Sequence, residues 1–459
     1  MINPEHYDYR HPTLTADLVM KGGITSGVVY PLAACELAQT YRFRNVGGTS
    51  AGAIAAALTA AAECGRDSGG FAKLARLPEW LGNDGHLFGT FQPQRVTRRL
   101  FKVATAGIGK KHRITRVVGA AVRRYPMAAA AGAVPGLVAT RLAASDGGGV
   151  RLAAPVAVAL GGALGGVGGG LYWATTRGLP KNFFGLCTGM DGHRKSDQPA
   201  LTPWLTQQLD DIAGREPADP PLTFGDLKRA DVNLEMVTTS LSNGRPFRLP
   251  FREGRFFFDP DEMRRLFPER VVEWMVSCPG GMEADVEAGE EDVEYAELVR
   301  RLVRPLRPLP ASQNLPVVVA TRMSLSFPGL MSAVPLWAVD ETRKDNRAAA
   351  RAWKKWLKPR RGQWFDSDVD PRTLHDAPSE RLEPEHCWFS DGGIVSNFPV
   401  HFFDRPLPRH PTFAINLRPF PPTRRRAPTS GPTSGSRPPR RPGPAIGGIP
   451  GGGPKAASR

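Results

Sequence analysis

The sequence predicts an α/β protein built on a mainly parallel central sheet. A unit of strand, glycine-rich loop and apolar helix occurs twice within the first 62 residues. Its parts are residues 16–20, 21–27 and 28–37, and then residues 42–46, 47–52 and 53–62. Parallel strands need a crossover connection, usually a helix, so the repeat favours parallel pairing with helices on the faces of the sheet. With 459 residues, 41% of them hydrophobic, the chain is long enough to bury a large core.

Further strands are expected downstream of this repeat. The dipeptide Asn243-Gly244 predicts a tight turn between two of them, and the β-branched run at 316–320 is typical of a buried strand. The expected strands are residues 233–239, 246–251, 256–258, 316–320, 387–390 and 412–417.

Positive charge is concentrated in two segments. The net charge is +16; residues 423–459 carry eight Lys or Arg and no acid, and residues 95–124 carry ten without a carboxylate. Such blocks suit anionic lipid or nucleic acid, and a solvated basic face is the alternative. Aromatic residues are not interleaved with these cations as base stacking requires, so no specific nucleic acid partner is expected.

Cysteine usage and the N-terminus indicate an intracellular setting. Five widely spaced cysteines form no C-x-x-C pair, which argues for a reducing compartment and against a zinc or redox motif. Residues 1–16 are polar and broken by prolines, unlike a secretory signal. The expected location is the cytosol or the cytosolic side of a membrane.

Residues 114–176 form a low-complexity apolar insertion and predict a membrane hairpin with limbs 125–142 and 152–175. The second limb has no charge over a length that can cross a ~30 Å hydrocarbon layer. Cations flank both ends of the pair, so the positive-inside rule puts both ends in the cytosol. Gly161, Gly165 and Gly169 have the spacing that lets two helices approach closely in lipid. A surface insertion or a buried soluble helical pair is the alternative.

Ser50 is the candidate nucleophile. The pattern Gly48-x-Ser50-x-Gly52 lies between a predicted strand and a predicted helix, as in a nucleophile elbow. The start of that helix, including the Ala51 N–H, presents backbone donors to negative charge that forms on the substrate.

A second glycine-rich loop is the candidate oxyanion hole. Gly22, Gly23, Ile24 and Gly27 follow the first predicted strand, where backbone N–H groups can approach a ligand. A phosphate-binding loop is the competing interpretation, although the loop matches neither G-x-x-x-x-G-K-[ST] nor G-x-G-x-x-G.

Serine needs a general base, and Asp391 is the best-placed carboxylate. It ends an expected strand and precedes two glycines that allow a tight turn, although Asp-Gly-Gly is also common in surface turns. A Ser-His-Asp triad that uses His401 or His410 is the rival arrangement.

Taken together, these three segments resemble the patatin-like phospholipase family. The resemblance implies a three-layer hydrolase fold, a Ser50–Asp391 dyad, and an oxyanion hole from the loop at 22–27 and Ala51. It also implies fatty-acyl esters of membrane phospholipids or lysophospholipids as substrates, with no metal and no cofactor. Ile24 departs from the third glycine of the family loop, and Ser26 from its basic residue. A catalytically inactive membrane-associated scaffold and a soluble Ser-His-Asp esterase are the alternatives.

The expected organisation has four parts. Residues 1–113 and 177–419 form the catalytic domain, residues 114–176 are the apolar insertion, and residues 420–459 are a disordered basic tail rich in Pro, Gly and Ser.

Overall fold

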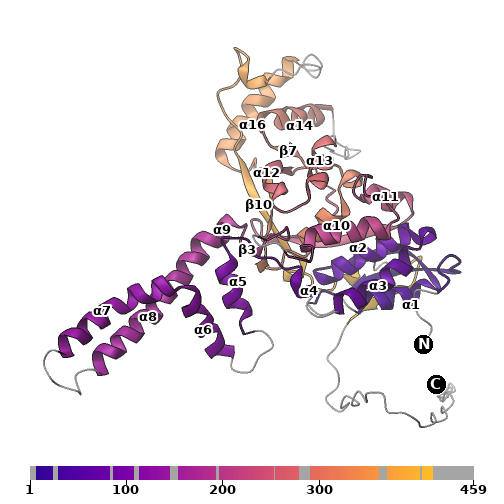
Figure 1. Ribbon diagram of the computed structural model, residues 1–459. Coiled ribbons are helices and arrows are strands. Elements are labelled where there is room, and N and C mark those ends of the chain that lie inside the picture. Colours follow the sequence, from indigo (N-terminus) through magenta and orange to yellow (C-terminus); the bar gives the residue numbers. More distant parts are fainter. Residues whose placement is uncertain are drawn as a thin grey trace, which may run out of the picture. The chain divides into compact units, whose positions relative to one another are not determined.

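The computed structural model describes most of the chain up to residue 416 (Figure 1). The described residues are 7–23, 29–82, 86–107, 113–144, 153–192, 196–252, 254–278, 290–360, 370–403 and 406–416. Residues Met1–Leu417 form one compact unit, and the fold below is that of this unit. The expected tail at 420–459 lies outside the described residues, as do Ile24 and Gly27 of the candidate oxyanion loop.

Most strands join one mixed sheet, whose order is β11-β1-β2-β4-β10-β9-β6-β7, with β5 paired to β4. β3 and β8 pair separately. The strands are β1 (Leu14–Met20), β2 (Tyr41–Gly48), β3 (Gly185–Cys187), β4 (Asn233–Ser240), β5 (Arg245–Leu249), β6 (Phe257–Phe258), β7 (Arg307–Pro308), β8 (Gly329–Met331), β9 (Val334–Val339), β10 (Pro384–Asp391) and β11 (Thr412–Ile415).

The expectation of a mainly parallel sheet is wrong. Within the main sheet, the parallel pairs lie around the repeated unit: β1 pairs with β2 and β11, and β2 pairs with β4. The pairs β4·β5, β4·β10, β10·β9, β9·β6 and β6·β7 are antiparallel. The β4–β5 hairpin turns where the sequence predicts, with Gly244 at φ 63°. The strand–helix repeat stops after two units. Beyond it, a short turn joins β4 to β5, whereas the other antiparallel pairs bring together strands that are far apart in the sequence.

Helices fill the segments between the strands. They are α1 (Tyr30–Ala38), α2 (Ala51–Cys64), α3 (Gly70–Gly82), α4 (His86–Gly89), α5 (Arg98–Thr105), α6 (Arg113–Arg124), α7 (Pro126–Ala144), α8 (Ala153–Trp173), α9 (Leu179–Lys181), α10 (Leu201–Ile212), α11 (Phe224–Arg229), α12 (Pro260–Arg264), α13 (Glu269–Ser277), α14 (Glu290–Leu302), α15 (Val317–Ser324) and α16 (Lys344–Leu357).

Helix α2 lies at the centre of the main core. It packs on β1, β2 and β4 and against α1, α3, α10 and α15. Nearly all of its residues are buried, and most are alanine. Small side chains let the helix approach the sheet closely, and a Cβ atom at Gly52 would lie 2.4 Å from the Met20 carbonyl oxygen. The two residues between β2 and α2, Thr49 and Ser50, therefore form a tight strand-to-helix turn against the end of β1.

The expected strand at 316–320 is instead the start of helix α15. All eight residues of α15 are buried, so no polar face marks a helical period. A short apolar run does not distinguish a buried strand from a buried helix. Burial of the valines outweighs their modest helix-propensity cost of less than about 1 kcal/mol each.

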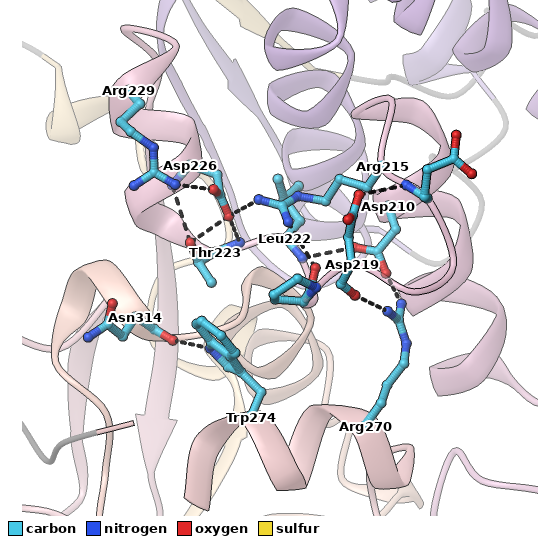
Figure 2. A network of polar contacts seen from close by, with 12 residues as sticks. Asp210, Arg215, Asp219, Leu222, Thr223, Asp226, Arg229, Arg270, Trp274 and Asn314 are labelled. Carbon is cyan, nitrogen blue, oxygen red and sulfur yellow. Dashed lines mark hydrogen bonds and ion pairs between the residues drawn. The ribbon is translucent and has the colours of Figure 1, made fainter. Parts of the chain in front are cut away.

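A polar network involves residues of α10, α11 and α13 and of the segments next to them (Figure 2). Asp210 accepts a hydrogen bond from Leu222 N–H at 2.8 Å and forms an ion pair with Arg270. Thr223 caps α11 in a capping box with Asp226. Trp274 Nε1 donates to the Asn314 carbonyl oxygen at 2.9 Å, just before α15 begins. The network therefore fixes the approach to the helix that carries two residues of the site described below.

Helices α7 and α8 occupy the two limbs of the predicted hairpin and lie side by side (Figure 1). A Cβ atom at Gly132 would lie 1.9 Å from the Gly162 carbonyl oxygen, and one at Gly166 would lie 2.0 Å from that of Ala128. The predicted contact through Gly161, Gly165 and Gly169 is wrong, since a Cβ there meets nothing within 4 Å. On α8, the glycines that meet α7 are Gly162 and Gly166, which have the same four-residue spacing as the predicted set. The two sets are one residue apart, which places them on faces of the helix about 100° apart.

By length and composition alone, one described helical segment, Val156–Lys181, is able to cross a membrane. Only 11% of its most apolar window is buried in the protein.

Candidate active site

Ser50 stands at the turn between β2 and α2 in a strained backbone conformation. Its φ of 57° and ψ of −130° are sparsely populated by residues with a Cβ atom. The Ser50 N–H donates to Ser324 Oγ at 3.3 Å. This is the geometry of a nucleophile elbow, in which the side chain is exposed above the end of the sheet.

The glycines of the motif are required by close backbone contacts. A Cβ atom at Gly48 would lie 2.2 Å from the Gly52 carbonyl oxygen. One at Gly22 would lie 2.9 Å from the Thr49 carbonyl oxygen and 3.1 Å from Ser50 Cβ. The two glycine-rich loops therefore meet at Ser50, because the parallel strands β1 and β2 end at the same edge of the sheet.

Asp391, the last residue of β10, faces Ser50 and is 2% exposed. Oδ1 accepts a hydrogen bond from the Gly393 N–H at 2.6 Å. Burial raises the pKa of Asp391, while hydrogen bonds from the Ser50 side chain and the Gly393 N–H act to lower it. Oδ2 is buried and has no hydrogen-bond partner among the described residues, so this carboxylate oxygen is left with an unused acceptor.

Two serines beyond the sequence-predicted pair connect α15 to the site. Ser324 Oγ accepts from the Ser50 N–H, and the Ser326 carbonyl oxygen accepts from the Asp391 N–H at 3.0 Å. Ser390 Oγ donates to the same carbonyl at 2.7 Å. The last residue of α15 and the residues that follow the helix therefore hold Ser50 and Asp391 in register.

Arg322 is a fully buried cation beneath this segment. Its guanidinium donates to Ser326 Oγ at 2.6 Å and to the carbonyl oxygens of Thr188 and Ser332 at 2.9 and 3.0 Å. Ion pairs with carboxylates are absent for Arg322 in the part of the chain that the structure describes. Burial lowers the pKa of Arg322 to about 10, so it stays charged at neutral pH. Arg322 lies in the last turn of α15, where the negative end of the helix dipole favours a cation.

Asn397 is a further residue of the site that the sequence analysis did not single out. Its carbonyl oxygen accepts from the Gly22 N–H at 2.9 Å. Its side chain fills the space where Cβ atoms of Gly22 and Gly393 would lie. The Asp-Gly-Gly loop is thereby connected to the first glycine loop, and the only available signal was an asparagine six residues after Asp391.

The donors for an oxyanion are placed only in part. The Gly22 N–H already donates to Asn397, so it is not free to hold an oxyanion. The lack of a side chain at Gly22 instead lets its loop approach Ser50 closely. Ala51 begins α2, so its N–H has no acceptor within the helix. Gly23 lies in a described coil after β1, whereas Ile24 and Gly27 lie outside the described residues.

The rival histidines are poorly placed for a triad. His410 Nδ1 lies 2.8 Å from the hydroxyl of Thr15, which pairs with Arg42 at the beginning of β2. Ser50 follows the far end of β2, about 20 Å away at ~3.3 Å per residue. His401 is exposed, and among the described residues no hydrogen bond or ring contact joins it to Ser50 or Asp391.

The surroundings offer apolar surface rather than metal ligands. Phe327, Ile394 and Val395 are 45–50% exposed and follow the residues that contact Asp391. Among the described residues there is no group of three His, Cys, Asp or Glu side chains placed to hold a metal. A cavity of about 920 Å³ lies elsewhere, against Asn45, Asn233 and Arg248, and is not lined by Ser50 or Asp391.

Comparison with known proteins adds one relative. The chain is similar to a bacterial suppressor protein. It is 38% identical to the "RpoH suppressor" of Rhizobium meliloti (strain 1021) over an alignment of 458 positions. The alignment covers 89% of this chain and 66% of the relative, so the chain spans somewhat less than two thirds of that protein's length. No protein-family model matches the chain, and no solved structure matches it.

Proposed function

We propose that the protein is a serine lipid-acyl hydrolase of the patatin-like type that cleaves fatty-acyl esters of phospholipids or lysophospholipids. The observation that carries the proposal is the pairing of Ser50, strained at a strand-to-helix turn, with the buried carboxylate of Asp391. Strained backbone and a perturbed carboxyl group concentrate at functional sites. The name of the relative states no reaction, so the proposal stands on the site.

In acylation, Asp391 takes the hydroxyl proton of Ser50 as Oγ bonds to the ester carbonyl carbon. The negative charge that forms on the carbonyl oxygen is stabilised by backbone donors, with the Ala51 N–H as the described candidate. When the tetrahedral intermediate collapses, the C–O bond of the ester breaks. The leaving alkoxide receives the proton from Asp391, and the acyl group remains on Ser50.

Deacylation repeats these steps with water. Asp391 takes a proton from the water that attacks the acyl carbonyl, and then returns it to Ser50 Oγ as the fatty acid leaves. A raised pKa suits both directions, because a carboxyl group accepts and releases protons more readily when its pKa is closer to the working pH.

Two features of the chain support a lipid substrate. The exposed Phe327, Ile394 and Val395 offer an apolar surface next to the dyad. In addition, α7 and α8 expose large apolar side chains that a water-soluble protein normally buries, among them Leu137, Leu160 and Leu164 at 55–63% exposure. We propose that these two helices insert into a membrane as a hairpin, with the dyad on the cytosolic side.

Fluorophosphonate labelling tests the chemistry. Wild type is expected to become labelled at Ser50 and to hydrolyse a short soluble ester, whereas Ser50→Ala and Asp391→Asn lose hydrolysis to a similar extent, because the pair acts as one unit. Ser379→Ala changes an exposed serine that precedes β10, whose opposite end carries Asp391; it is the matched control and should behave as wild type. Absence of labelling in a folded wild type would favour an inactive scaffold instead.

Deletion of residues 114–176 tests the hairpin. The deleted protein is expected in the soluble fraction, with activity on the soluble ester retained and activity on vesicles reduced. If the full chain needs no detergent after carbonate extraction, the hairpin does not span a bilayer.

A further inference from the structure

Helix α6 contacts both helices of the α7–α8 hairpin near its base and presents two different outward flanks. Its inner face, with Val117 and Ala121, packs in a small cluster with Val103, Tyr125 and Val167, separate from the main core. On one flank Val118 and Val122 are 43% and 39% exposed. Arg116 and Arg123, both exposed, lie on the opposite flank at ~100° per residue.

Three further cations lie near this base. Arg124 ends α6, Arg99 of α5 lies close enough to Tyr125 for an electrostatic interaction, and Arg177 stacks 5.8 Å above the Trp173 ring at the end of α8. Tyr125 in turn packs against Gly170 of α8. We call Arg99, Arg116, Arg123, Arg124 and Arg177 the basic collar.

The basic collar has no acidic counterpart. Residues 86–145 and 147–190 contain no Asp or Glu, so all formal side-chain charge in and beside the hairpin is positive apart from Asp146. Ion pairs that involve the five collar residues are absent from the part of the chain that is described. Uncompensated surface cations attract an anionic partner, and the absence of acids extends that attraction over the whole base of the hairpin.

The apolar and aromatic residues around the collar select the kind of partner. Tyr172 and Trp173 are 71% and 63% exposed at the end of α8, where an amphipathic ring suits the boundary between head groups and acyl chains. The valine flank of α6 suits the apolar side of the same boundary. A nucleic acid would match the charge and leave Val118, Val122, Tyr172 and Trp173 without apolar contacts.

We propose that the basic collar binds the head groups of anionic phospholipids, with α6 lying in the interfacial plane of the bilayer that the hairpin enters. The inference rests on the membrane insertion proposed above. It adds a lipid preference: the protein would bind preferentially to membrane regions rich in anionic lipid, and its dyad would lie near those lipids.

The test titrates the detergent-solubilised full chain with short-chain phosphatidylglycerol or short-chain phosphatidylcholine. A Ser50→Ala background prevents consumption of the lipid. Each cation near a membrane surface contributes about a fivefold factor in binding, so Arg116→Gln/Arg123→Gln/Arg124→Gln should weaken phosphatidylglycerol binding by roughly 100-fold in low salt. Lys344→Gln/Arg351→Gln/Lys355→Gln on α16 removes equal charge from exposed residues elsewhere and should bind as the parent does.

Flotation with vesicles of phosphatidylcholine alone separates the two proposals. Continued flotation of the triple collar variant, together with its loss of phosphatidylglycerol binding, supports the collar. Failure of wild type to float on any vesicle refutes the hairpin and with it the collar. Equal binding of the two lipids, an unchanged triple variant, or duplex DNA binding tighter than phosphatidylglycerol would each overturn the collar even if the hairpin inserts.

Discussion

Replacing Ser50 by glycine and by alanine isolates the strain stored at the candidate nucleophile. Both substitutions remove the hydroxyl that contacts Asp391, and both keep the backbone N–H that donates to Ser324. Only glycine lacks the Cβ atom that makes φ 57° and ψ −130° unfavourable. A residue held in such a region costs about 1–3 kcal/mol.

The expected difference follows from two opposing contributions. Glycine relieves the strain, which stabilises the folded state. Its greater conformational freedom in the unfolded chain opposes this gain by about 0.5–1 kcal/mol. Ser50→Gly should therefore be more stable than Ser50→Ala by about 0.5–2 kcal/mol. Unfolding entropies of about 2 cal/mol/K per residue make this a rise in Tm of roughly 0.5–2 °C for a unit of this size.

The assay is replicate thermal unfolding of the two variants, with activity on a soluble ester measured in parallel. Activity should be absent in both. The matched control is Ala348→Gly on the exposed face of α16, where glycine should lower the free energy of unfolding by about 1 kcal/mol. A Ser50→Gly protein that melts at or below Ser50→Ala would refute the conclusion that the elbow is strained.

The remaining predictions concern charge at three residues, Asp391, Arg322 and Arg270. Because burial raises the pKa of Asp391, activity should fall with decreasing pH through a midpoint above the ordinary value of 3.8 in a pH–rate profile, and an unshifted midpoint would contradict this. The same shift means that the carboxylate disfavours the folded state above the ordinary pKa, so Asp391→Asn should be inactive at neutral pH with an equal or higher Tm. Arg322→Met removes the hydrogen bond to Ser326 and should lower kcat at least about tenfold, with KM for a soluble ester unchanged; a selective rise in KM would argue against positioning. Arg270→Ala leaves the Asp210 carboxylate buried without its ion pair, so it should lower the free energy of unfolding in urea by about 2–3 kcal/mol. A loss under about 0.5 kcal/mol would show that this network contributes little to stability.

The sequence by itself predicted the features that depend on neighbouring residues. The two strand–helix units, the hairpin turn at Gly244 and the turn at Ser50 all appear where local patterns placed them. Each is governed by backbone freedom or by periodicity over a few residues, and such information is present in a short stretch of sequence.

Tertiary structure decided the features that depend on distant partners. The valine run before Arg322 is a helix whose residues are all buried, so its own sequence pattern shows no polar face from which a helical period could be read. The antiparallel half of the sheet depends on which strands meet, and a strand's own sequence does not state its partner. Ser324, Ser326 and Asn397 join the site from segments more than 250 residues beyond Ser50. Ser326 and Asn397 accept through backbone carbonyls, which any residue type offers, and the hydroxyl of Ser324 is brought to Ser50 only by the fold. The choice between the two glycine faces of α8 was likewise settled by packing, because both have the same spacing and only contact with α7 distinguishes them.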